Sequence, residues 1–154
     1  MTSNLLGLYR FAEQRDIDVD WVSMTRATSL SVPLPDGRYA IAIDPWKMDS
    51  LTMETVCLAH ELGHCETGSF YNQYAVCDIR KKHENRADKW AIRRLIPRDQ
   101  YETALADGCT ELSALANRFG VTPEFMEKAV CFYTYGNLAV ESYRPILGYF
   151  LYLN

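Results

Sequence analysis

The chain has 154 residues, 48% of them hydrophobic and 23% charged, with a formal net charge of −4. This length and balance are those of an ordinary globular protein, and a chain of this size buries roughly 70% of its unfolded surface without a disulfide scaffold. The acidic balance argues against a nucleic-acid-binding protein, which usually carries positive charge to neutralise phosphates. We therefore expect a single domain over residues 1–154 and no nucleic-acid partner.

The cysteines and the N-terminus bear on the cellular compartment. Five cysteines are present, without the close paired spacing of a secreted disulfide framework. The first residues lack the basic start and long apolar run of a signal peptide. No stretch reaches the ~18 uncharged apolar residues of a membrane helix. The sequence therefore predicts a cytoplasmic protein with no membrane partner.

The first third of the chain predicts one helix followed by a small antiparallel sheet. Apolar residues follow helical spacing within residues 4–15, and they alternate with acidic residues through 16–21, as in a strand. The turn residues Asp36 and Gly37 precede an apolar run at residues 39–43, which predicts a hairpin.

The pattern becomes helical from residue 50 onward. A helix capped by Ser50 or Thr52 is predicted to run to about residue 65, and a second helix is predicted over residues 82–95. A loop joins these two helices. We expect them to form the core of the fold.

The remaining sequence predicts short helices and an apolar end. Two or three helices are expected within residues 98–135, one of them capped by Thr122 with Pro123 in its first turn. The apolar stretch at residues 145–153 predicts a packed tail or a contact surface.

His60, Glu61 and His64 form an HExxH motif in the first long helix. Histidines four positions apart project from one helix face, so both imidazoles can bind one ion. Neutral imidazole suits zinc, and Glu61 is placed to act as a general base on a water whose pKa the ion lowers. The motif also occurs by chance on surface helices, so its context decides. Here all three histidines of the chain lie within residues 60–83.

A catalytic zinc needs a third protein ligand and an open position for water. The metzincin pattern would place a third histidine where this chain has Phe70. Glu84 can supply the ligand instead, because it shares a helical stripe with apolar residues that are expected to pack inward. Asp88, one turn later, can accept a hydrogen bond from a ligating histidine. The alternative makes Glu84 an exposed charge and Asp88 a partner of a nearby basic residue.

These two helices resemble those of the ImmA/IrrE family of metallopeptidases over about residues 40–130. The resemblance rests on the HExxH motif and on the series Glu84-x-x-Ala87-Asp88-x-Trp90-Ala91-x-x-x-Leu95-Ile96-Pro97. The family more often has Asn at the position of Asp88 and Phe at the position of Trp90.

The resemblance implies zinc bound by His60, His64 and Glu84, with Glu61 as the catalytic base. Members of the family often occur in phages and mobile elements, where they cleave helix-turn-helix repressors. A repressor of this kind is therefore the implied protein substrate and partner, although no residue of this chain identifies it.

Other features leave alternatives open. Tyr71 and Tyr74, between the two motifs, can donate a hydrogen bond to a tetrahedral oxyanion or simply pack the loop. Residues 111–122 resemble the first helix and turn of a DNA-binding helix-turn-helix, but the helix after them has few of the side chains that read bases. The predicted strand at residues 39–43 is expected to be the sheet edge along which an extended substrate adds.

The sequence therefore predicts an α+β fold, in which a small antiparallel sheet packs on a two-helix, zincin-like core with a helical C-terminal part. These parts are expected at residues 1–48, 49–98 and 99–154. The predicted function is that of a regulatory, gluzincin-like zinc endopeptidase, with hydroxide attack on a peptide carbonyl at the zinc and Glu61 as general base. Two alternatives remain: a zinc-binding adaptor or sensor that does not cut, and a DNA-binding regulator acting through residues 111–130.

Overall fold

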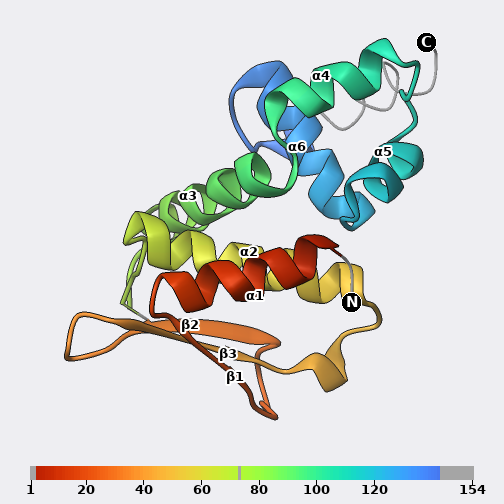
Figure 1. Ribbon diagram of the computed structural model, residues 1–154. Helices are drawn as coiled ribbons and strands as arrows, with labels where there is room; N and C mark the ends of the chain where they lie inside the picture. The colour runs from red at the N-terminus through yellow and green to blue at the C-terminus, as the bar shows by residue number, and fades with distance from the viewer. Residues whose placement is uncertain (1–2, 73, 143–154) are drawn as a thin grey trace. The chain divides into compact units, whose positions relative to one another are not determined.

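A computed structural model describes residues 3–72 and 74–142 of the chain (Figure 1). The fold is α+β, as predicted, and it contains two compact units, residues 1–91 and 92–154. The elements in chain order are α1 (Ser3–Gln14), β1 (Asp18–Trp21), β2 (Ser29–Pro33), β3 (Tyr39–Ile43), the short 3-10 helix η1 (Pro45–Lys47), α2 (Leu51–Thr67), α3 (Cys77–Leu95), α4 (Arg98–Ala106), α5 (Leu112–Phe119) and α6 (Pro123–Tyr135). The expectation of a single domain stays a prediction.

The sheet of the first unit is mixed, not antiparallel as predicted. β3 lies in the centre, paired antiparallel with β2 and parallel with β1. Trp21 at the end of β1 and Ser29 at the start of β2 both pair with Ile43, so residues 22–28 carry the chain across the end of β3. The predicted β2–β3 hairpin is confirmed. The alternation in residues 16–21 predicts a strand but not on which side of the sheet, or in which direction, that strand pairs.

The central position of β3 corrects one functional expectation. Both edges of residues 39–43 are already hydrogen-bonded, so an extended substrate cannot add along this strand. The free edges of the described sheet belong to β1 and β2. Since β2 also packs against α2, its free edge runs beside the helix that carries the HExxH motif.

Two helices cover one face of the sheet. In Figure 1, α1 and α2 lie side by side over the strands, and both pack into the core of this unit. Leu5, Leu8 and Ala12 of α1 are buried, at the helical spacing that predicted this element. On the sheet, Ile41 and Ile43 of β3 are buried on the face that meets the helices.

Helix α2 has well-defined ends. The Ser50 side chain accepts a hydrogen bond from the Met53 backbone N–H, which confirms Ser50 as the N-cap. Gly68 ends the helix in the left-handed region, with φ of 63°. The chain turns there, and the Ser69 backbone N–H donates to the His64 carbonyl.

Helix α3 begins at Cys77, five residues before the predicted start at residue 82. Asp78 lies in its first turn, where a negative charge favours the helix N-terminus. The additional residues 77–81 include no buried apolar side chain, so hydrophobic periodicity in the sequence does not predict this first turn. The predicted end at Leu95 is confirmed.

Within the described residues, the second unit contains the short helices that were expected. α5 and α6 pack together, with Leu115, Phe119, Phe125 and Met126 buried. Thr122 caps α6 and accepts a hydrogen bond from the Phe125 backbone N–H, as predicted. The apolar stretch at 145–153 lies outside the described residues. No helix among the described residues combines the length and the apolar character needed to cross a bilayer.

Candidate metal centre

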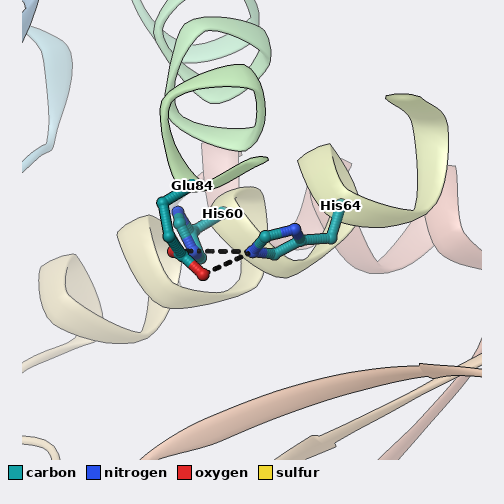
Figure 2. A group of neighbouring side chains, drawn as sticks. All are labelled: His60, His64 and Glu84. Atoms are coloured by element: carbon teal, nitrogen blue, oxygen red, sulfur yellow. Dashed lines mark hydrogen bonds and ion pairs between the residues drawn. The ribbon is translucent and has the colours of Figure 1, made fainter. Parts of the chain in front are cut away.

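Three side chains converge where α2 and α3 pass each other (Figure 2). The Nε2 atoms of His60 and His64 are 3.1 Å apart. The Glu84 carboxylate reaches both, with 2.9 Å from Oε2 to His60 Nε2 and 3.4 Å from Oε1 to His64 Nε2. One ligand atom from each residue thus faces a common point, and the three lie within 4.8 Å of one another.

The spacing of these atoms fits a metal ion. Zinc bonds of about 2.0–2.1 Å in tetrahedral geometry separate neighbouring ligand atoms by about 3.3 Å. The two Nε2 atoms are 3.1 Å apart, and the two oxygens of the Glu84 carboxylate lie 2.9 Å from His60 Nε2 and 3.4 Å from His64 Nε2, all close to this value. Two imidazoles and one carboxylate also form a donor set found in catalytic zinc sites. The predicted ligands His60, His64 and Glu84 are therefore brought together and can hold a metal.

Hydrogen bonds behind the rings orient both histidines. His64 Nδ1 lies against the Ser69 carbonyl oxygen, which can only accept, so this nitrogen carries a proton. His60 Nδ1 lies 2.7 Å from Asp88 Oδ1, so the carboxylate that was predicted to support a histidine of the site contacts His60. In neutral rings both Nε2 atoms then present lone pairs to each other and to Glu84. A cation placed between the two Nε2 atoms and the Glu84 carboxylate would bind all three and remove the repulsion between their lone pairs.

The electrostatics of the site also favour a positive charge. Burial alone lowers the pKa of His60, but its hydrogen bonds to Asp88 and Glu84 outweigh burial and raise the pKa to about 10. The interaction of the Glu84 carboxylate with the His60 ring, and after it with the His64 ring, holds the pKa of the Glu84 carboxyl far below its usual range. A proton on His60 or a metal ion can supply the charge, and the two compete for the same lone pair.

Close contact between the two helices sets the position of Glu84. A Cβ built on Gly63 would lie 2.4 Å from the Ala87 carbonyl oxygen and 2.9 Å from the Ala87 Cα. Only a residue without a side chain permits this approach. Ala87 comes three residues after Glu84, on the same face of α3, so the contact holds the carboxylate at the height of the histidine rings. Ala87, Asp88 and Ala91 are buried, which confirms the predicted inward stripe.

Glu61, the predicted base, lies beside the ligands and is held by the sheet. It is only 6% exposed. Ser29 Oγ donates to its Oε1 at 2.8 Å, and Ser31 Oγ donates to its Oε2 at 2.6 Å. These serines are absent from the site predicted from the sequence. Their alternation in Ser29-Leu30-Ser31 was the available signal, since it puts two hydroxyls on one face of a strand.

A cavity of about 430 Å³ opens over these groups. Its lining comes from β2, α2, the loop after α2 and α3: Ser29, Leu30, Ser31, His60, Glu61, His64, Ser69, Phe70, Tyr71 and Glu84. Tyr71 OH donates to Glu84 Oε1 at 2.7 Å, so this tyrosine contacts the centre through Glu84. Tyr74 is 83% exposed and lies outside the lining. A contact of either tyrosine with substrate stays a prediction.

The chain was compared with models of known protein families. The family model Peptidase_M78, described as an IrrE N-terminal-like domain, matches residues 12–130. This range includes the sheet, α2 and α3, and so all the residues of the centre. No curated protein matches the sequence.

Proposed function

Because the chain belongs to the IrrE N-terminal-like family of metallopeptidases, as its resemblance to ImmA/IrrE predicted, we propose that it is a zinc-dependent endopeptidase. The observation that carries the proposal is the convergence of His60, His64 and Glu84 in one cavity with the buried carboxylate of Glu61. A purely structural zinc site would have four protein ligands and no cavity beside it.

Each residue of the centre has a role in this proposal. A zinc ion bound by His60, His64 and Glu84 would polarise the peptide carbonyl and lower the pKa of a nearby water. Glu61 takes a proton from that water as it attacks the carbonyl carbon, and then passes the proton to the leaving amine. Asp88 keeps the His60 ring oriented and makes Nε2 a better donor.

The substrate is proposed to bind as an extended strand along β2. Ser29, Leu30 and Ser31 line the cavity, and this strand has a free edge among the described residues. Addition of a strand would bring a peptide carbonyl to the metal centre, with main-chain hydrogen bonds supplying affinity. The cut segment must therefore be able to leave its own fold and extend.

The proposed substrate class is a helix-turn-helix repressor-like protein, on the basis of the family resemblance. Cleavage of a repressor would make the peptidase regulatory. A cytoplasmic location is proposed with it, and the free state of all five cysteines agrees with a reducing compartment.

The deciding experiment combines metal analysis with a cleavage assay. Purified chain should contain one zinc per molecule and should cut the helix-turn-helix regulator encoded beside its gene. Glu61→Gln keeps the size of the side chain but removes the proton acceptor, so zinc content and folding should persist while turnover falls at least ~10²-fold. Unchanged turnover in zinc-loaded Glu61→Gln would refute the assignment of the base. Binding of the regulator without cleavage by the unsubstituted chain would favour the adaptor alternative.

A further inference from the structure

The hydroxyls that hold Glu61 come from the same strand on which the substrate is proposed to add. We propose that Ser29 and Ser31 are positioning residues, which hold the Glu61 carboxylate in its working orientation before substrate binds. This inference rests on the proposed function, because it concerns the base of that reaction.

The first argument is the geometry of the pair. Ser29 and Ser31 are two residues apart in β2, so both side chains leave the same face of the sheet, toward α2. Each serine binds a different oxygen of Glu61, at 2.8 and 2.6 Å. Rotation of the carboxylate would lengthen both bonds at once. The two bonds therefore fix the plane of the carboxylate as well as its position.

The second argument is that the carboxylate keeps acceptor capacity. An ionised carboxylate offers about four lone-pair sites, of which the two serines use two. Glu61 lines the same cavity as His60 and His64, so its carboxylate can be reached from that cavity. A water in this cavity can therefore donate a proton to Glu61 without displacing either serine.

A structural role alone would also place hydrogen-bond donors on a buried carboxylate. Loss of the hydroxyls has a different effect under each role. A structural role predicts lower stability with normal turnover in the molecules that remain folded. A positioning role predicts slower turnover with unchanged substrate and zinc binding, because the base is no longer held in the reactive geometry.

The test uses pairs of variants that differ only in a hydroxyl. Thr and Val have the same shape and both suit a strand, so Ser29→Thr/Ser31→Thr is compared with Ser29→Val/Ser31→Val. The Val pair should lower kcat at least ~10-fold, with KM and zinc affinity within ~2-fold of the Thr pair. Ser29→Val and Ser29→Thr alone serve as a milder pair if Ser31, the more buried position, does not accept a larger side chain. Ser23→Val and Ser23→Thr, in the exposed loop after β1, should not differ in kcat.

A second measurement does not depend on turnover or on zinc. The side-chain carboxyl ¹³C resonance of Glu61 in the zinc-free chain can be assigned by its loss in Glu61→Gln. It should shift in the Val variants and stay near its original position in the Thr variants. Equal kcat in the Thr and Val variants of an active enzyme would overturn this inference and leave the proposed function standing. An unshifted Glu61 resonance in the Val variants would have the same consequence. A zinc-loaded unsubstituted chain that cleaves no peptide overturns both.

Discussion

The contact between Gly63 and Ala87 makes a sharp prediction about helix packing. In Gly63→Ala, the added methyl would lie 2.4 Å from the Ala87 carbonyl oxygen, where ordinary contacts begin near 3.4 Å. The helices must separate locally by about 1 Å, because the obstructing atoms belong to a backbone and not to a flexible side chain. Such overpacking costs up to ~3 kcal/mol, and the higher helix propensity of Ala offsets about 1 kcal/mol. The expected net loss is about 2 kcal/mol in the free energy of unfolding.

The same displacement should reach the metal centre. Zinc sites tolerate deviations of about 0.2 Å in ligand distance, whereas Glu84 would move with α3 by up to about 1 Å. We therefore expect zinc affinity to fall at least ~10-fold, the scale seen when the support of a ligand is lost. Both quantities are accessible, through urea unfolding of the zinc-free chain and through zinc titration against a competing chelator.

Gly7→Ala provides the matched control. Gly7 lies in α1, and a Cβ there would meet nothing within 4 Å. This variant should keep its zinc affinity and should be neutral or more stable by up to ~1 kcal/mol. If Gly63→Ala matched Gly7→Ala in both measurements, the close helix contact would not control the position of Glu84, and our reasoning about the site would be wrong.

Three further predictions concern the metal ligands and their support. Glu84→Ala removes one of the three proposed ligands. Zinc affinity, measured by competition with a chelator, should therefore fall by more than the ~10–100-fold that is typical of losing a residue that only supports a ligand. Cys77→Ala, the control, should leave zinc affinity unchanged. Equal zinc affinities in these two variants would exclude Glu84 as a ligand. Asp88→Ala should weaken zinc binding by ~10–100-fold. Asp88→Asn should retain most of the affinity, because the Asn side-chain oxygen can still accept a hydrogen bond from the His60 ring. An undiminished zinc affinity in Asp88→Ala would mean that Asp88 only pairs with nearby basic groups. Zinc binding should also release a proton, because the pKa of His60 without metal is about 10 and the ring is protonated at neutral pH. The affinity should then rise as pH rises toward 10 and fall as pH falls, by up to about tenfold per pH unit for one proton, and a flat profile between pH 7 and 9 would contradict this.

The grouping of His60, His64 and Glu84 was predictable from the sequence, because it depends on residue spacing within single helices. His60 and His64 occupy one helix face by their four-residue separation, and Glu84 shares a stripe with buried alanines. These arguments need only the helical period. The contact of Asp88 with a ligating ring was predictable from the same stripe.

The features that were missed depend on contacts between distant segments. The side of β3 on which β1 pairs is set by the path of residues 22–28, and alternation within a strand carries no information about that path. Ser29 and Ser31 meet Glu61 only through the packing of β2 on α2, across some thirty residues of sequence. The need for glycine at position 63 likewise becomes visible only when α3 lies against α2.

The turn that ends α2 also determines which ring nitrogen of His64 carries the proton. Gly68 stops the helix, the Ser69 N–H caps the His64 carbonyl, and the carbonyl of the same Ser69 meets His64 Nδ1. One residue thus satisfies both the backbone and the ring of His64. A substitution that let α2 continue by another turn would take away the acceptor that keeps the proton on Nδ1, and the ring would then be free to carry it on Nε2 instead. The point at which this helix stops therefore decides which tautomer of His64 faces the metal.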